Sequence, residues 1–458
     1  MKILTFLVHR QPAILTKQAA RHPKQKPIAE HILASFGGEI FLFAASLLLG
    51  ILTARYLGPD GKGKFNVVYY AVGLLSIIFS LRFQWAFTYY LSKNKERLGE
   101  IIFTAFLVGL VSTSAVILLI TSFPAFFYST IIKGVQVQWS TLLLLCASTY
   151  MWNLLIALYA GLARFKTRAL FMGTTYFLKA ALVIFTLKIV NGNLNDLFFN
   201  MGLVEIIIYS LLLVVLLAKS SSIRINLANF VGMLKYSLQS FPSVISDMVI
   251  LRIDVFFVNF FAGPSQVGLY TVAISLSQMF LYIPTAVRSV LMPYIAANGD
   301  QEITQKLSRL LVILLIGMAI ILIPFVWVIL VPLYGEAFAS SRSLYLILLP
   351  GSLFWGIFTV ISSDLEGRGL PWKVSTVSII SSVITVLLDF LLIPKLGVIG
   401  AAIASSVTHC LSMVMIAVVY TRWMHIKMKA LLIPGREDFR FLTGFISTVF
   451  IKLIKKAI

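Results

Sequence analysis

Charged residues are scarce in this chain of 458 residues, and cysteine and histidine are rarer still. Asp, Glu, Lys and Arg together make up 12% of the sequence, about half the share of a soluble domain. A soluble chain of this length would need charged surface on two or three domains, so a soluble fold is excluded. Cys146 and Cys410 lie in separate apolar stretches, and the five histidines are scattered. We therefore expect no metal site and no cofactor.

The sequence also lacks the common motifs of catalytic and nucleotide-binding sites. It contains no phosphate-cradling GxxxxGK, no HExxH and no nucleophile elbow. The longest connector that we place outside the membrane runs from Ser122 to Trp139 and holds no carboxylate. We therefore expect that the protein is not an enzyme. A membrane glycosyltransferase or a glycan polymerase is the least favoured of three possible functions.

Long apolar stretches make up most of the sequence, in which 59% of the residues are hydrophobic. A helix needs roughly 20 apolar residues to cross a bilayer, and irregular backbone cannot face lipid. Stretches of this length are separated by short polar or Gly/Pro segments. They predict an all-α integral membrane protein of about 12 transmembrane helices, at residues 36–57, 65–91, 101–121, 140–162, 169–190, 196–218, 240–262, 267–294, 307–329, 342–364, 374–394 and 397–421.

Lysine and arginine alternate between the loops as the positive-inside rule requires. With the N-terminus inside, 27 of the 38 Lys and Arg residues fall in the tails and inner loops, 7 in outer loops and 4 within spans. The net charge of +21 is thus explained by orientation in a membrane, and we expect no nucleic-acid partner. Both termini are predicted to be cytoplasmic.

Two loops that lie 205 residues apart are similar to each other. Gly58, Pro59 and Gly63 correspond at this offset to Gly263, Pro264 and Gly268. Six spans per half give two parallel six-helix repeats, related by an axis along the membrane normal. The predicted organisation is a basic cytosolic tail at 1–35, an N-lobe at 36–218, a cytosolic connector at 219–239, a C-lobe at 240–421 and a basic cytosolic tail at 422–458, the last with an interfacial amphipathic helix at 439–458.

Two of the loops contain the motifs Leu57-Gly58-Pro59 and Pro394-Lys395-Leu396-Gly397. These motifs resemble those of the polysaccharide flippase family, which belongs to the superfamily of multidrug, oligosaccharidyl-lipid and polysaccharide exporters, and the likeness covers residues 36–421. The resemblance implies a V-shaped bundle around a central cavity lined with cations. It also implies transport of undecaprenyl-diphosphate-linked oligosaccharides across a bacterial plasma membrane for O-antigen or exopolysaccharide synthesis. Relatives that flip the peptidoglycan precursor usually have two further C-terminal spans, from which this chain departs.

Several arginines lie within the predicted spans, where a charged side chain costs about 2.5–3.5 kcal/mol at the bilayer centre. A diphosphate carries at least two negative charges, which guanidinium groups bind in pairs. Arg82 and Arg288 occupy near-equivalent places in the two halves, and a polar stripe beside Arg288 would suit a sugar-facing wall. The candidate substrate-binding residues are Arg288, Arg82, Arg252, Gln278 and Tyr282. In the alternative interpretation, the arginines reach the inner headgroups or pair with acids between helices.

Acidic residues within spans suggest coupling to an ion. Asp247 and Asp254 are seven residues apart and share one helical face, and Glu39 lies on a polar face of the first helix. These three are candidates for accepting a proton or a sodium ion, and the alternative is salt bridges between helices. Lys179 and Glu205 are predicted to form a structural pair.

Two functions therefore stay open from the sequence. The first is a flippase that works by alternating access, with a lipid-linked oligosaccharide, membrane lipids, a glycan polymerase and glycosyltransferases as expected partners. The second is an ion-coupled exporter of drugs or organic cations from the related twelve-helix class, for which an acidic and aromatic cavity is expected.

Overall fold

The structure is a computed structural model that describes residues 28–218, 220, 226–298 and 301–440, and this part of the chain is helical. Most of the predicted N-terminal tail and of the predicted interfacial helix lies outside the described residues. The helices are α3 (Ile28–Phe79), α4 (Phe83–Lys93), η1 (Lys95–Arg97), α5 (Leu98–Ser122), α6 (Pro124–Phe126), η2 (Phe127–Ile131), α7 (Trp139–Gly161), α8 (Phe165–Ile184), η3 (Phe185–Ile189), α9 (Leu194–Leu217), α10 (Leu227–Ala262), α11 (Pro264–Ser277), η4 (Gln278–Leu281), α12 (Tyr282–Asn298), α13 (Gln301–Tyr334), η5 (Glu336–Phe338), α14 (Ser341–Gly367), α15 (Pro371–Leu396), α16 (Val398–Met424) and α17 (Met428–Leu432).

Each predicted span coincides with a helical segment of this fold. Within the described residues, ten helices are long and apolar enough to cross a membrane. The number of these helices is lower than the twelve spans predicted from the sequence, for two reasons. Helix α3 contains both the first span and the start of the second, which meet at Gly58 with a φ of 63°. Helix α10, which is not among the ten, carries Asp247, Arg252 and Asp254.

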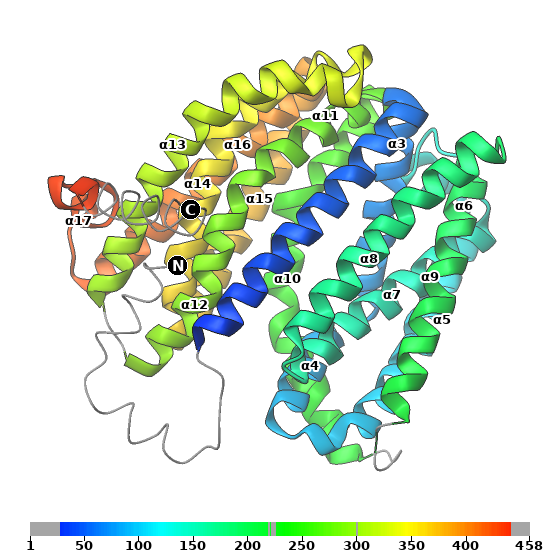
Figure 1. The fold of residues 1–458 in the computed structure, drawn as a ribbon, viewed down its shortest axis with the longest axis horizontal. Coiled ribbons are helices and arrows are strands. Elements are labelled where there is room, and N and C mark those ends of the chain that lie inside the picture. The colour runs from blue at the N-terminus through cyan, green and yellow to red at the C-terminus, as the bar shows by residue number, and fades with distance from the viewer. Residues whose placement is uncertain (1–27, 219, 221–225, 299–300, 441–458) are drawn as a thin grey trace, which may run out of the picture.

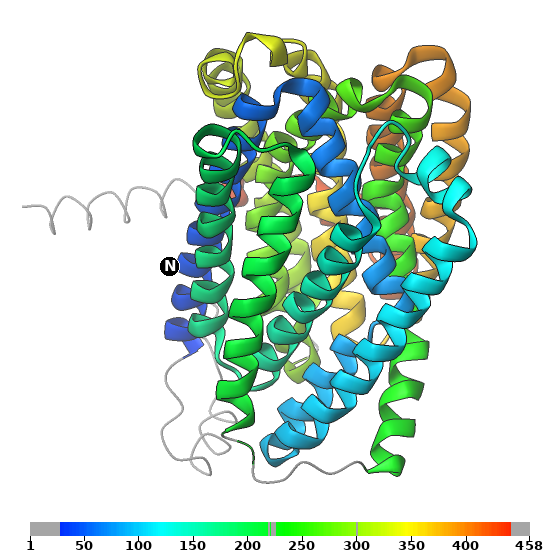
Figure 2. The same ribbon diagram turned by 90° about the vertical axis from the view of Figure 1, so that its right-hand side faces the viewer.

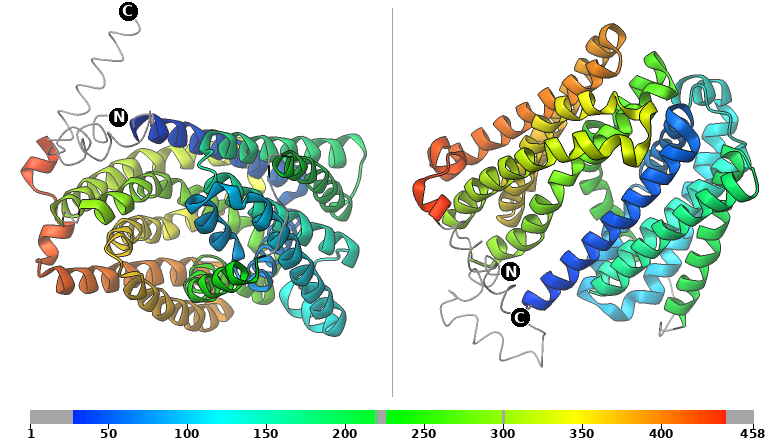
Figure 3. Two further views of the ribbon diagram at one scale, coloured as in Figure 1. Left: turned by 90° about the horizontal axis from the view of Figure 1, so that it is seen from below. Right: turned by 45° about the horizontal axis from the view of Figure 1, so that its top comes forward.

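The helices form two groups that correspond to the two halves of the sequence. Figure 1 shows α4 to α9 on one side and α12 to α16 on the other, with α3, α10 and α11 between them. Figure 2 shows that the long helices run along one common direction, and Figure 3 shows the two groups from two further sides. This is the arrangement expected for two helical lobes that cross one bilayer.

The outward faces of the helices are apolar, which is the reverse of a soluble protein. On α5 and α13, for example, Val111 is 69% exposed and Ile320 is 68% exposed. Such side chains are stable in lipid but not in water. Many buried side chains are instead polar, among them Ser362, Asp364 and Asp389. The outer surface of the bundle therefore suits a membrane, as predicted.

The two repeats meet at a tight contact in the loops that the sequence places outside. A Cβ on Gly63 would lie 1.7 Å from the carbonyl oxygen of Pro264, and a Cβ on Gly268 would lie 1.9 Å from the carbonyl oxygen of Pro59. The two contacts are reciprocal, because Gly268 is the equivalent of Gly63 and Pro264 is the equivalent of Pro59 in the other repeat. Such reciprocity is expected at a twofold axis, so the structure supports the predicted repeat.

One hydrogen bond lies on the same axis. The side-chain amide of Asn66 donates to the hydroxyl of Thr271 over 2.6 Å, and these two residues are 205 positions apart. Arg55 adds hydrogen bonds from the N-lobe to the carbonyls of Pro332 and Leu333. We refer to Pro59, Gly63, Asn66, Pro264, Gly268 and Thr271 together as the outer seam.

Three local features differ from the sequence prediction. The second span is not one continuous helix, because Leu81 and Arg82 take positive φ values of 46° and 56° between α3 and α4. The eighth span is interrupted by η4, so its predicted polar stripe does not continue along one face. The seventh helix begins at Leu227, and most of the predicted connector therefore belongs to α10.

The first half of α10 crosses to the other lobe. Its Phe230 ring stacks on Phe83, and its Tyr236 ring stacks on Tyr89 of α4 with centroids 4.7 Å apart. In the opposite direction, Phe43 of α3 contacts the ring of Tyr282 at the start of α12. Each lobe thus extends its first helix onto the other lobe, toward the end opposite the outer seam.

Candidate substrate and ion sites

Four charged residues from both lobes come together between the lobes, and we call them the charge cluster: Arg82, Asp247, Arg288 and Glu366. The carboxylate of Asp247 on α10 interacts electrostatically with Arg288, Arg82 and Glu366, and Ser378 of α15 hydrogen bonds to it. The Nη2 atom of Arg288 donates to both carboxylate oxygens of Glu366, over 2.7 and 3.0 Å. The cluster therefore joins the second helix of the N-lobe to helices α10, α12 and α14.

The helix break before α4 positions Arg82. A left-handed conformation is unfavourable for a non-glycine residue, and such strain is often found at functional sites. The break ends α3 and makes Arg82 the N-terminal cap residue of α4. Its guanidinium lies 4.2 Å from the centroid of the Trp85 ring, which is half exposed. The indole fixes the direction of the guanidinium by a cation–π contact.

Arg252 and Gln278 form a second polar contact, at the boundary with α3. The guanidinium of Arg252 donates to the side-chain oxygen of Gln278 over 3.3 Å and lies 5.0 Å from the ring centroid of Tyr70. Since Tyr70 belongs to the N-lobe, Arg252 also bridges the lobes. Arg252 is not among the charged groups that act on Asp247.

A fully buried carboxylate lies inside the C-lobe at Asp254. One of its oxygens accepts hydrogen bonds from Tyr270 of α11, over 2.5 Å, and from Ser405 of α16, over 3.0 Å. Asp254 also interacts electrostatically with Asp389 of α15. We call Asp254 and Asp389 the acid pair.

Asp389 is fully buried, yet neither of its carboxylate oxygens has a hydrogen-bond partner among the described residues. Two adjacent carboxylates in a dry interior cannot both stay ionised without a cation, because their repulsion and desolvation add. The acid pair is therefore able to hold a proton or a small cation. Within the described chain, no group of three or more His, Cys, Asp or Glu side chains is arranged for a metal ion.

A small cavity of about 30 Å³ lies beside Asp254. It is lined by residues that include Gln278, Ser352 and His409. Gln278, which lines this cavity, also contacts Arg252 at the boundary between the lobes.

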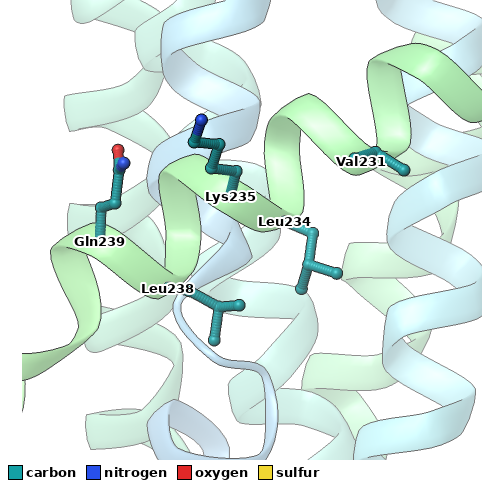
Figure 4. Close-up of a pocket in the computed structure, with 5 residues that line it drawn as sticks. All are labelled: Val231, Leu234, Lys235, Leu238 and Gln239. Atoms are coloured by element: carbon teal, nitrogen blue, oxygen red, sulfur yellow. The ribbon is translucent and has the colours of Figure 1, made fainter.

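A larger groove of about 350 Å³ lies on the surface of α10, away from these sites. Figure 4 shows Lys235 and Gln239 pointing to one side of the helix and Leu234 and Leu238 to the other. The groove is shallow and has no acidic residue, so we do not assign the chemistry of the protein to it.

The predicted candidates separate into distinct groups in the structure. Arg82, Arg288 and Asp247 lie in the charge cluster, Arg252 and Gln278 lie at the boundary with α3, and Asp254 lies in the C-lobe. Tyr282 packs against Phe43. Glu39 belongs to α3, but its side chain lies outside the described part. Asp247 and Asp254 do share a face of α10 but lie about 10 Å apart along its axis, in different clusters.

Two residues of these sites, Glu366 in the charge cluster and Asp389 in the acid pair, were not among the candidates predicted from the sequence. Glu366 lies in the last turn of α14, and Asp389 lies in α15. An acid near a helix C-terminus opposes the helix dipole, which was a usable signal for Glu366. The predicted structural pair is confirmed, because Lys179 and Glu205 form a buried salt bridge.

Two repeated helical lobes with charged groups between them are the architecture of a membrane transporter. A family model described as polysaccharide biosynthesis protein matches residues 28–299, and the chain belongs to this family. The resemblance found in the sequence is thereby confirmed.

Two relatives come from the archaeon Haloferax volcanii. The chain is 29% identical over 172 residues to the probable flippase AglR, which covers 36% of each chain. It is 24% identical over 238 residues to the probable low-salt glycan biosynthesis flippase Agl15, which covers 49% of this chain and 50% of the relative. The chain therefore matches half or less of the length of these curated relatives.

Solved structures of low sequence identity share the fold. The lipid II flippase MurJ in an inward closed conformation has a TM-score of 0.69 at 17% identity, over 92% of this chain and 97% of that one. An inward-facing multidrug resistance transporter of the MATE family has a TM-score of 0.65 at 16% identity, over 85% of this chain and 94% of that one. The predicted all-helical transporter fold is confirmed. These relatives are described as flippases and transporters, none as an enzyme.

Proposed function

We propose that this protein carries a lipid-linked oligosaccharide from one membrane leaflet to the other for the synthesis of a surface glycan. The lipid carrier is an undecaprenyl diphosphate, and the lobes rock about the charge cluster in an alternating-access cycle. Membership of a polysaccharide biosynthesis family and the likeness to probable glycan flippases support this proposal.

The observation that carries the proposal is the convergence of Arg82 and Arg288 from the two lobes on Asp247. A diphosphate needs two cationic forks, one for each phosphate group. Arginines that come from opposite lobes can bind one dianion together only while the lobes are close. Substrate binding is then linked to the movement of the lobes.

The saccharide would extend from the phosphates along the boundary between the lobes. Arg252 and Gln278 offer hydrogen-bond donors and acceptors there, and Tyr282 offers an aromatic ring. The prenyl chain would stay in lipid, because the outer faces of the helices are apolar. The protein would act in a bacterial plasma membrane with both termini in the cytoplasm, beside glycosyltransferases and a glycan polymerase.

The acid pair would couple this movement to an ion gradient. A proton or a sodium ion bound between Asp254 and Asp389 removes the repulsion between them and thereby changes the packing of α10 against α15. Replacing Asp389 with asparagine should weaken the dependence of flipping on the ion gradient while substrate still binds. Full gradient dependence in this variant, measured in proteoliposomes, would exclude the acid pair as the coupling site.

The proposal is tested by single alanine variants in a cell that needs the polymer. Arg288→Ala and Arg82→Ala should each reduce surface glycan at least tenfold, and Arg252→Ala should reduce it less, because Arg252 lies outside the charge cluster. Arg436→Ala is the control, since this arginine is exposed near the C-terminal end of the described chain. If all three variants express normally and make full amounts of polymer, the cation mechanism is wrong.

Export of drugs or organic cations is the second candidate function. It is favoured by the acid pair, since buried carboxylates suit a cationic substrate or a coupling proton. A deletion strain that becomes sensitive to drugs but keeps its surface glycan would support this function over the first. Loss of glycan with unchanged drug sensitivity would reject it.

A further inference from the structure

The charge cluster is electrically balanced before any substrate binds. Among the described residues it has two cations, Arg82 and Arg288, and two anions, Asp247 and Glu366. A diphosphate that carries two negative charges would therefore meet a neutral site. Its binding would leave the cluster with two excess negative charges unless one or both of the acids change state.

The two acids differ in their access to water. The side chain of Asp247 is exposed in the structure, and Ser378 hydrogen bonds to its carboxylate, so its ionised form does not depend on one arginine alone. The side chain of Glu366 is only 18% exposed, and its described partner is Arg288. Glu366 also lies at the C-terminal end of α14, where the helix dipole disfavours an anion. The ionised form of Glu366 thus depends on Arg288 far more than that of Asp247 does.

A phosphate that binds Arg288 would come close to Glu366. Both described hydrogen bonds between the two residues use the same nitrogen of Arg288, Nη2. A phosphate on the remaining edge of the guanidinium would stand one guanidinium width from the carboxylate. Like charges at this separation in a partly buried site disfavour the ionised carboxylate.

We propose that Glu366 takes up one proton from solvent when the phosphates bind Arg288, so that substrate binding is coupled to proton uptake within the charge cluster. This inference rests on the proposed function. The protonated carboxyl becomes a hydrogen-bond donor to a phosphate oxygen, and it releases the proton when the phosphate leaves. The charged groups that act on Glu366 are Arg288 from α12 and Asp247 from α10, and Asp247 in turn interacts with Arg82 before α4 and with Ser378 from α15.

The test is isothermal titration calorimetry on the full-length protein in detergent. The probe is a short-chain prenyl diphosphate N-acetylglucosamine, which has a substituent on each phosphate and therefore does not titrate near neutral pH. Binding is measured in buffers of different ionisation enthalpy. The wild-type protein should take up about one proton for each probe bound. Its affinity for the probe should therefore fall about tenfold for each unit by which the pH rises around neutrality, as one-proton linkage requires. Glu366→Gln should bind with no proton uptake and no pH dependence.

Asp438→Asn provides a matched control, because Asp438 also pairs with a partly buried arginine, Arg309, but lies outside the cluster. This variant should take up the same number of protons as the wild type. If the wild type binds the probe without proton uptake, the inference is wrong and the proposed function stands. If the wild type does not bind the probe, the proposed function itself fails, and the inference fails with it. If Glu366→Gln does not fold, a wild type that binds the probe without any pH dependence still overturns the inference.

Discussion

Replacing Gly63 with alanine should prevent the outer seam from closing. The new Cβ would lie 1.7 Å from the carbonyl oxygen of Pro264, whereas nonbonded carbon and oxygen atoms stay more than about 3 Å apart. The carbonyl belongs to the backbone at the start of α11, so it cannot rotate away as a side chain would. The lobes must therefore separate by more than about 1 Å at this point.

The free-energy cost can be estimated from core overpacking. An inserted methyl group in a well-packed interior costs about 1–3 kcal/mol, and the rigid contact at Gly63 places it at the upper end. About 3 kcal/mol changes the ratio of closed to open outer seam by a factor of roughly 100. Gly268→Ala should act in the same way, because its Cβ would lie 1.9 Å from the carbonyl oxygen of Pro59. The double variant should cost little more than either single one, since the two contacts open together.

Cross-linking across the seam measures the closed state. Asn66 and Thr271 touch on the axis, so a cysteine pair at these two positions should react with a short thiol cross-linker only when the seam is closed. The background must have Cys146 and Cys410 replaced by alanine, because both are free thiols. Cross-linking should be fast in this background and strongly reduced when Gly63→Ala is added.

Gly73→Ala is the matched control in the same helix, because a Cβ there meets nothing within 4 Å. Both substitutions bring the same gain in helix propensity, about 1 kcal/mol. Any difference between them therefore reports on the contact at the seam. Equal cross-linking rates in the two variants would refute the reasoning and show that the repeats do not meet through Gly63.

Two further predictions concern stability. Glu205→Ala should destabilise the protein by about 3–5 kcal/mol, because Lys179 would be left buried without its partner. A double variant with Lys179→Met and Glu205→Leu should unfold at a temperature closer to wild type, and a Glu205→Ala protein as stable as wild type would show that the pair is not a buried ion pair. At the other end of the chain, burial opposes the ionisation of Asp438, but hydrogen bonds from Arg309 and from the backbone of Gly435 outweigh it and lower the pKa of this carboxyl. Because the pKa is lowered in the folded state, its contribution is complete above the ordinary Asp value of about 3.9 and is lost as the pH falls below it. Asp438→Asn should therefore reduce stability by about 1 kcal/mol at pH 7 and by progressively less below pH 4, as followed by thermal unfolding; a constant difference down to pH 2 would contradict this assignment.

Much of the fold follows from local properties of the sequence. The number and approximate position of the spans depend on stretches of about 20 apolar residues, which lipid requires wherever they occur. The repeat could be recognised in the sequence because the two reciprocal contacts near the symmetry axis require a glycine at both Gly63 and Gly268. Lys179 and Glu205 could be paired because they lie on consecutive helices, where few other partners are available.

The sites depended on contacts that no local pattern contains. Asp254 and Asp389 are 135 residues apart in sequence, and only the packing of α10 against α15 brings their carboxylates together. The break at Arg82 was not predictable from propensity, because Leu81 and Arg82 have no special tendency toward positive φ. Their conformation is imposed by the packing on either side of the break.

The sequence by itself determined that the chain crosses a membrane many times in two equivalent halves, because each span must satisfy its own backbone hydrogen bonds in lipid. Only the tertiary structure decided which charges are balanced and which are not. Arg288 was recognisable as a cation within a span, but its pairing with Glu366 arises where the end of α14 approaches α12. A charge in a low-dielectric interior depends chiefly on its nearest neighbours in space, and those neighbours come from distant parts of the chain.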